Sequence, residues 1–279
     1  RGSWPLPKFR TFAANRAAND LQQLIKQWKS ILCRLTLKTM YGNLGRIGVI
    51  TLATDTSVHP EIQRLMPKGV HTYPAPILLP RGEVNAQALA EMLETDSLEN
   101  AASILTWTGA KTILFACTTG SLVHGLGWDK ELVDRVTAAS DLPATTTATA
   151  VLRAFKALNV TKLAVVTPYI DELNQIEKKF FEDSGFAVHD ITGLGLTTDP
   201  EIGDLYPSDA LASLEKVFDE SCDAIFISCT DWHIVELVPE LEAKYGVPVI
   251  TSNLAGAWAA LRDIGYTTPQ PENGKLFTV

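Results

Sequence analysis

The sequence predicts an α/β protein whose strands form parallel sheets. From Arg46 onward, short runs rich in Val, Ile and Leu alternate with longer stretches of helical period. The short runs show no alternation of apolar and polar residues, which is typical of strands buried on both faces. Amphipathic helices between such strands supply the crossovers that parallel neighbours need. In sheets of this kind, ligands bind at the carboxyl ends of the strands.

Seven strands and six helical stretches follow from this pattern. The strands are predicted at residues 46–52, 71–79, 111–117, 162–168, 186–191, 222–228 and 247–251. The helical stretches are predicted at residues 84–107, 129–140, 147–159, 171–185, 208–220 and 231–246. The TTTATA run at 145–150 follows Pro143 and is predicted to begin the third helix.

The composition is that of an ordinary globular protein. Hydrophobic residues make up 46% of the 279 residues and charged residues 20%. No stretch approaches about 18 consecutive apolar residues, so we expect no membrane span. The cysteines, Cys33, Cys117, Cys222 and Cys229, are too few for a disulfide framework and are expected to be reduced thiols. No CxxC pair occurs, which argues against a structural zinc site.

Charge is distributed unevenly along the chain. Residues 1–46 carry nine Lys or Arg and one acid, a net charge of +8, whereas the remainder carries −16. We expect residues 1–45 to be an extension outside the main fold, either a transit peptide or a sequence derived from the vector. The acidic body argues against nucleic-acid binding. The predicted location is the cytoplasm, or an organelle matrix if the extension is a transit peptide.

A faint internal repeat places a cysteine at the same point of each half. RIGVITLATD at 46–55 matches KLAVVTPYID at 162–171, and KTILFACTT at 111–119 matches DAIFISCTD at 223–231. The offsets are 116 and 112 residues, so a duplication is the favoured interpretation. Related halves that face each other would bring Cys117 and Cys229 to opposite walls of one cleft.

The two cysteines are the candidates for chemistry. A lone strand cysteine is usually a small buried hydrophobe, but two Cys-Thr turns at equivalent strand ends have no obvious packing reason. The hydroxyl and N–H groups around them suit a carboxylate or an oxyanion and would favour a thiolate of lowered pKa. The candidate binding residues in these turns are Thr118, Thr119, Ser228 and Thr230.

The other two strand-end turns of the repeat supply further candidates. Thr54 and Asp55 could bind a polar group of a substrate, or Asp55 could cap the helix that follows. Tyr169 is expected to point into the cleft, the alternative being a half-buried aromatic. His124 and His233 are the histidines nearest the thiols, and either could form a Cys–His pair. A histidine at the start of a helix, as expected for His233, is more often solvated.

At this point the residues resemble a known family, the aspartate/glutamate racemase superfamily. The resemblance rests on the two Cys-Thr turns, the TPY turn at 167–169 and PVITSN at 248–253. Within the superfamily it is closest to the branch of maleate cis-trans isomerases and arylmalonate decarboxylases. It runs from about Arg46 to the end of the chain and is strongest at 144–174 and 226–262.

The resemblance implies an architecture of two lobes. Each lobe would be a Rossmann-like, three-layer α/β unit with a parallel four-stranded sheet, and a pseudo-twofold axis would relate the two. Residues 46–145 would form the first lobe, residues 146–251 the second, and residues 252–279 would pack back on the first. The active site would lie in the cleft between them, with neither cofactor nor metal.

The resemblance also implies a function, with alternatives that the sequence leaves open. The first choice is a two-cysteine isomerase of a small carboxylic acid, similar to maleate cis-trans isomerase. An amino-acid or aryl-acid racemase, or a decarboxylase, is the second. The decarboxylases carry Gly in place of the first cysteine, so the presence of Cys117 counts against decarboxylation. The third is a small-acid binding protein with unreactive thiols. A small carboxylic acid is the expected partner, with association into homo-oligomers left open.

Carried over by position, Cys117 and Cys229 are the catalytic thiols, and Thr118, Thr119, Tyr169 and Thr230 fall where the family holds substrate carboxylates. Asp55 departs from the family, because maleate isomerases usually have Asn there. A carboxylate would repel a dicarboxylate substrate. Asp55 therefore turns away, is protonated, or marks a different substrate.

Overall fold

The structure of the chain is a computed structural model that describes residues 22–29 and 41–279. Residues 22–29 are helical, and the main fold spans Leu44–Val279. The predicted extension at 1–45 falls largely outside the described residues. Within the described part of the chain, no helix has the length and apolar character needed to cross a bilayer.

The first sheet contains four parallel strands in the order β2-β1-β3-β4. Its strands are β1 (Gly45–Leu52), β2 (Val70–Ile77), β3 (Thr112–Phe115) and β4 (Ala144–Thr146). The central strands β1 and β3 are buried along almost their whole length, as expected for a sheet covered on both faces. Strand β2 contains Pro74 and Pro76, which cannot donate to a ladder, and it accordingly lies at the edge.

The second sheet repeats this arrangement. Its parallel strands are β5 (Lys162–Tyr169), β6 (Ala187–Leu196), β7 (Ala224–Ile227) and β8 (Val249–Thr251), in the order β6-β5-β7-β8. Each half therefore places its second strand at one edge, its first and third strands in the middle, and its fourth strand at the other edge. The predicted α/β class with two four-stranded parallel sheets is confirmed.

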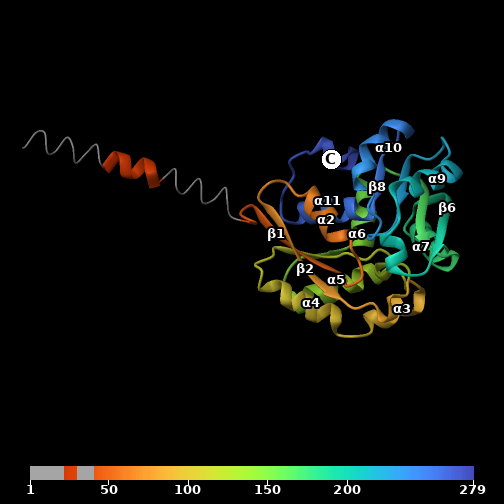
Figure 1. Ribbon diagram of the computed structural model, residues 1–279, viewed down its shortest axis with the longest axis horizontal. Helices are drawn as coiled ribbons and strands as arrows, with labels where there is room; N and C mark the ends of the chain where they lie inside the picture. Colours follow the sequence, from red (N-terminus) through yellow and green to blue (C-terminus); the bar gives the residue numbers. More distant parts are fainter. Residues whose placement is uncertain (1–21, 30–40) are drawn as a thin grey trace, which may run out of the picture. The chain divides into compact units, whose positions relative to one another are not determined.

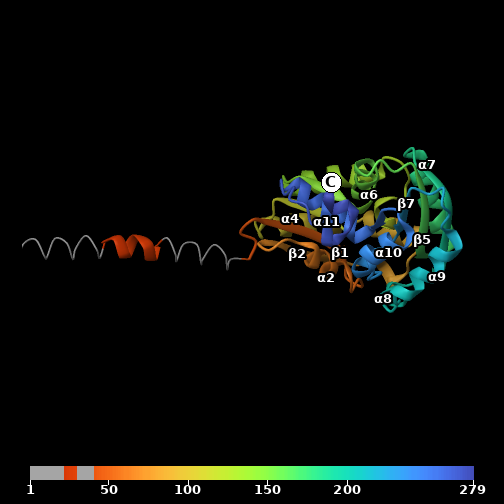
Figure 2. The ribbon, with the colours of Figure 1, turned by 90° about the horizontal axis from the view of Figure 1, so that it is seen from above.

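Helices cover both sheets (Figure 1). They are α2 (Val58–Leu65), α3 (Ala86–Leu93), α4 (Ser97–Thr106), α5 (Trp128–Ser140), α6 (Thr147–Ala157), α7 (Asp171–Asp183), α8 (Asp199–Gly203), α9 (Pro207–Val217), α10 (Val238–Tyr245) and α11 (Ser252–Asp263). Figure 1 shows α3, α4 and α5 on one side of β1 and β2, and α2 and α11 on the other. Figure 2 shows α7 and α9 at the end of the fold away from β2 and α4.

The two halves exchange their last helices. Helix α6 follows β4 of the first sheet, but its Phe155 packs edge-on against Phe181 of α7 and Phe226 of β7. Helix α11 follows β8 of the second sheet, but its Gly256 lies against Leu114 of β3. The two helices also pack against each other. Each lobe is therefore completed by a helix from the other half of the sequence.

The structure differs from the predicted elements in several places. Helices α2, α8 and α11 were not predicted. Strand β4 was not predicted either, because its three residues, Ala144–Thr146, form a short threonine-rich run typical of a helix start. The predicted helix at 84–107 is two helices, interrupted between Leu93 and Ser97. The predicted helix at 231–246 begins only at Val238, after a 3-10 turn at Val235–Leu237.

Candidate active site

Two cysteines line one small pocket from the ends of two strands. Cys117 follows β3 of the first lobe and Cys229 follows β7 of the second. Both line a small, nearly closed pocket at the carboxyl ends of the sheets, with a cavity volume of about 10 Å³, room for about one water molecule. The other lining residues are Leu52, Asp55, Val84, Leu89, Thr118, Thr119, Tyr169, Asp199 and Thr230. The pocket is therefore built from both lobes, and the thiols lie in its wall.

A serine at the start of α11 hydrogen-bonds to both Cys-Thr turns. The Ser252 hydroxyl accepts a hydrogen bond from Thr118 Oγ1 at 2.8 Å and from the backbone N–H of Cys229 at 3.1 Å. Thr118 belongs to the first-lobe turn and Cys229 to the second-lobe turn. Because one buried oxygen bridges both turns, their relative position is fixed by the packing of α11.

The first thiol sits in a turn that requires glycine. A Cβ on Gly120 would lie 2.9 Å from Cys117 Sγ and 3.5 Å from the terminal methyl of Met92. The N–H of Gly120 and the Thr119 hydroxyl instead hydrogen-bond to the Cys117 sulfur. Because residue 120 is glycine, the turn can bring hydrogen-bond donors to the Cys117 sulfur. A side chain at this position would displace the sulfur.

The second thiol sits on a strained backbone. Cys229 has φ of 110°, a region that residues with a Cβ seldom adopt. Its sulfur is hydrogen-bonded by the Tyr169 hydroxyl and by the N–H of Asp231. Backbone strain that the surrounding structure maintains is a recurrent feature of functional sites. Here it aims the sulfur at Tyr169 and the pocket.

The pKa values of both thiols are raised. Burial raises the pKa of Cys117 to about 12, and the charges of Asp199 and Asp55 add to the rise. Burial also raises the pKa of Cys229 well above its usual range, despite the hydrogen bond from Tyr169. The prediction of a thiol pKa lowered by the donor-rich turn is therefore wrong for the ligand-free protein, because desolvation outweighs the donors.

Asp55 both caps a helix and lines the pocket. Its Oδ1 accepts hydrogen bonds from the N–H groups of Ser57 at 2.9 Å and Val58 at 2.8 Å. Its Oδ2 is buried near the Asp231 carboxyl group. Burial and the charge of Asp231 raise the pKa of Asp55 well above its usual range.

Two further aspartates, Asp199 and Asp231, lie in the same part of the site and were not predicted from the sequence. Asp231 Oδ1 accepts hydrogen bonds from the N–H groups of Thr56 at 2.7 Å and Ser57 at 3.1 Å. Asp199 accepts a hydrogen bond from the Thr54 hydroxyl, and burial raises its pKa to about 6. Asp199 could have been found as the Asp-Pro helix start after a strand, and Asp231 as the neighbour of the second Cys-Thr.

Comparison with known proteins identifies the family. A family model of arylmalonate decarboxylase matches residues 47–277. The chain belongs to the arylmalonate decarboxylase family. The arylmalonate decarboxylase of Bordetella bronchiseptica is 30% identical over 172 residues, which cover 61% of this chain and 72% of that protein. The maleate isomerase of Nocardia farcinica is 25% identical over 249 residues, which cover 84% of this chain and 95% of the relative.

Solved structures of this family share the fold. A variant of the Pseudomonas putida maleate isomerase Iso with maleate has a TM-score of 0.79 at 21% identity, covering 84% of this chain and 97% of its own. A double mutant of arylmalonate decarboxylase in the liganded form has a TM-score of 0.75 at 26% identity, covering 84% and 98%. The predicted resemblance to the maleate isomerase and arylmalonate decarboxylase branch is confirmed.

In this family member, the structure brings most of the predicted site residues together. Those that line the pocket are Cys117, Cys229, Asp55, Thr118, Thr119, Tyr169 and Thr230. Thr54 and Ser228 do not line it: the Thr54 hydroxyl is directed to Asp199, and Ser228 lies behind the pocket beside the buried Glu177.

Neither candidate histidine lies at the thiols. His124 and His233 are exposed, and His124 packs edge-on against Trp128. Neither lines the pocket, so the structure offers no Cys–His pair within the described residues. Since the second-lobe helix starts at Val238, His233 lies in the turn before it and not at its first residue.

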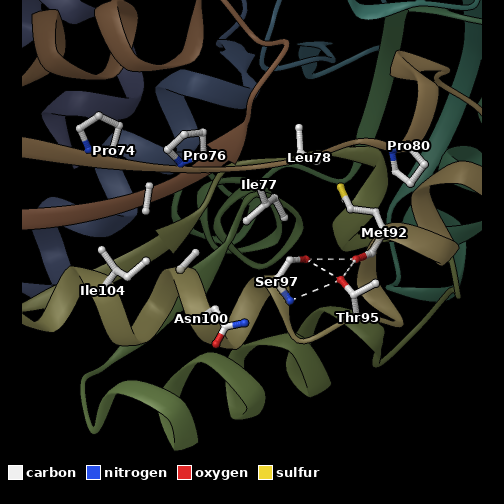
Figure 3. Close-up of a pocket in the computed structure, with 12 residues that line it drawn as sticks. Pro74, Pro76, Ile77, Leu78, Pro80, Met92, Thr95, Ser97, Asn100 and Ile104 are labelled. Atoms are coloured by element: carbon white, nitrogen blue, oxygen red, sulfur yellow. Dashed lines mark hydrogen bonds between the residues drawn. The ribbon is translucent and has the colours of Figure 1, made fainter.

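A wider hollow elsewhere on the first lobe lacks this chemistry. It lies between the edge strand β2 and helix α4, and Figure 3 shows Pro74, Pro76 and Leu78 along one side with Ile104 and Asn100 opposite. Its polar members are the neutral Thr95, Ser97 and Asn100. Among the described residues that line this hollow there is neither a thiol nor a carboxylate.

Proposed function

We propose that this protein is a cofactor-independent, cysteine-based isomerase of a small carboxylic acid, similar to maleate cis-trans isomerase. The observation that carries the proposal is the pair of thiols, Cys117 and Cys229, which line one pocket from opposite lobes. The relatives support it, because several are maleate isomerases that match 84% of this chain. A structural neighbour, a Nocardia farcinica maleate cis-trans isomerase variant, carries a covalently bound succinylcysteine intermediate.

Addition and elimination of one sulfur would interconvert the two isomers. The Cys117 sulfur would form a bond to one alkene carbon, and the electron pair of the C=C bond would move toward the substrate carboxylate. The remaining single bond can rotate. Expulsion of the sulfur then restores the double bond in the trans geometry. Hydroxyl and N–H groups of the Cys-Thr turns would stabilise the anion, an effect commonly worth about 3–4 kcal/mol per donor.

The proton of the Cys117 thiol has to leave as the S–C bond forms. The carboxylates whose charges act on Cys117 are Asp199 and Asp55. Asp199, with its pKa raised to about 6, is ionised at neutral pH and can accept the proton, whereas burial raises the pKa of Asp55 well above its usual range. Cys229, hydrogen-bonded to Tyr169, would act as the acid and base on the opposite face.

Proton NMR tests the proposal directly. The purified protein is incubated with cis-butenedioate (maleate) and with its monoamide, and the signals of the trans products are followed. We expect turnover of at least one compound. Cys117→Ala should abolish it because no other sulfur can add, and Cys229→Ala should reduce it by about 10²–10⁴-fold. Retained turnover in Cys117→Ala would exclude the mechanism.

Racemisation is the second candidate, supported by the same placement of the thiols on opposite lobes. In that reaction one thiolate removes the α-proton of a chiral acid and the opposite thiol returns a proton to the other face. Exchange of the α-proton with D₂O, dependent on both Cys117 and Cys229, would identify a racemase. If neither isomerisation nor exchange is observed while a small acid binds, the protein is a binding protein.

A further inference from the structure

The polar residues that line the pocket are of two kinds. Thr118, Thr119 and Thr230 of the Cys-Thr turns form the first group. The Thr118 hydroxyl donates to Ser252 and the Thr119 hydroxyl to the Cys117 sulfur, which leaves the Thr230 hydroxyl to donate to a substrate carboxylate. Asp55 and Asp199 form the second, acidic group. Carboxylate oxygens accept hydrogen bonds, so the acidic group suits a hydrogen-bond donor.

Donors near the acidic group are already engaged. The Thr54 hydroxyl donates to Asp199. The N–H groups of Thr56 and Ser57 donate to Asp231, and Thr56 Oγ1 donates to the same oxygen at 3.2 Å. These hydroxyl and N–H groups are therefore not free for a second substrate carboxylate.

The acidic group also carries negative charge. Asp55 and Asp199 both line the pocket, and Asp199, with its pKa raised to about 6, is ionised at neutral pH. Among the described residues that line the pocket there is no Lys, Arg or His to offset these charges. A second carboxylate bound here would face like charges, which is strongly unfavourable in a buried site.

We infer that the substrate is a carboxylic acid whose second polar group, bound at Asp199, is a hydrogen-bond donor such as an amide or an ammonium and not a second carboxylate. This inference rests on the proposed function for the identity of the site, and it narrows the substrate class. The substrate carboxylate would lie at the Cys-Thr turns, where Thr230 can donate to it. The amide or ammonium would donate to Asp199.

Binding of unreactive, saturated analogues tests the inference apart from catalysis. Isothermal titration calorimetry at pH 7.5 compares succinate with its monoamide, succinamate, and with 4-aminobutanoate. We expect succinamate or 4-aminobutanoate to bind at least about tenfold more tightly than succinate. Whichever of the two binds more tightly identifies the donor as an amide or an ammonium. Equal affinities, tighter binding of succinate, or no binding of any analogue at about 10 mM would overturn the inference.

Two matched variants test whether Asp199 causes the preference for a ligand with a hydrogen-bond donor. In Asp199→Asn the preference for succinamate or 4-aminobutanoate over succinate should fall by at least about fivefold. The asparagine side chain removes the charge and supplies a hydrogen-bond donor. Asp204→Asn makes the same change at an exposed position of the same segment and should leave the preference unchanged. A preference that survives in Asp199→Asn would refute the assignment. Thermal unfolding of each variant shows whether it is folded.

Turnover separates this inference from the proposed function. If maleate is isomerised with a kcat/KM equal to or higher than that of its monoamide, the inference fails and the isomerase assignment stands. If neither compound is isomerised but succinamate binds tightly, the isomerase assignment fails and the inference about the ligand stands.

Discussion

At the scale of single residues, the two thiols are equivalent in sequence but not in structure. Cys117 has an ordinary backbone conformation and depends on Gly120 for space. Cys229 has a positive φ and a hydrogen bond from Tyr169. The difference fits two roles, because a nucleophile needs room for a covalent bond to substrate. A proton donor needs a fixed direction.

The strained backbone at Cys229 predicts different stabilities for two variants that both lack the thiol. Glycine adopts a positive φ without penalty, whereas alanine does not. Cys229→Gly should therefore be more stable than Cys229→Ala by about 1 kcal/mol, although both lose the thiol and its activity. Urea unfolding of the two variants measures the difference. A less stable glycine variant would show that the backbone at this position is not strained.

A buried acid behind the pocket makes stability depend on pH. Burial raises the pKa of Glu177 to about 8, above its value of 4.5 in the unfolded chain. Between these pH values the folded protein binds more protons than the unfolded chain, so its stability falls as the pH rises through about 8. Glu177→Gln cannot ionise and should lack this loss.

The pH effect is measured as a difference between variants. Urea unfolding at pH 5, 7 and 9 should show Glu177→Gln gaining stability over the wild type as the pH rises, by a few kcal/mol at most. Glu182→Gln, an exposed change on the same helix, is the control. Other buried acids, such as Glu61 with its pKa raised to about 7, act in the same direction in both proteins and cancel. A constant difference across this range would contradict the assignment.

At the scale of elements, the exchange of α6 and α11 explains why the two halves cannot be separate domains. Phe155 of α6 belongs to the aromatic cluster of the second lobe, with Phe181, Phe186 and Phe226. Helix α11 in turn covers β3 and contacts α2 in the first lobe. A fragment cut between the sheets would lose one helix from its core and expose the apolar face beneath it.

Truncation of Phe155 tests this exchange. Phe155 is fully buried, so Phe155→Ala should reduce the free energy of unfolding by about 3–5 kcal/mol and do so in a single transition. Phe218→Ala, in a partly buried pair with Tyr245, should cost less. Two resolved transitions in the urea unfolding curve would mean that the lobes unfold independently, contrary to the exchanged packing.

At the scale of the whole molecule, the acidic wall of the pocket is also a contact between lobes. The turn after β1 belongs to the first lobe, and its Thr54 and Thr56 donate to Asp199 and Asp231 of the second. Glu61 of α2 likewise accepts a hydrogen bond from the N–H of Val235 in the second lobe at 3.0 Å. These contacts close the pocket over the thiols, which are 3% and 6% exposed.

Closure predicts slow reaction of the thiols with iodoacetamide. Since alkylation requires an exposed thiolate, both Cys117 and Cys229 should label slowly at pH 7 in the free protein. Asp231→Ala removes contacts between the lobes and should speed labelling by at least about tenfold, whereas Asp204→Ala, at an exposed site, should not. Mass spectrometry of peptides gives the rate for each cysteine. Rapid labelling of the wild type would show that the pocket opens freely without ligand.

The sequence by itself determined the class of fold and the two thiols. Apolar runs and amphipathic stretches follow from local burial, so β1, β3, β5 and β7 could be predicted, and the repeat paired Cys117 with Cys229. It also showed that Asp55 stands where maleate isomerases usually have Asn. The short strand β4 could not be predicted, because three threonine-rich residues carry too little local signal to outweigh a helix start.

Only the tertiary structure decided the charge state of the site. The pKa values of the thiols rise because the two lobes bury them, and burial is a property of the closed pocket and not of the Cys-Thr turn. Asp199 and Asp231 reach the site from segments far from Asp55 in sequence, and the charge of Asp231 helps to raise the pKa of Asp55. This proximity arises from the packing of one lobe on the other, which no local pattern in the chain specifies.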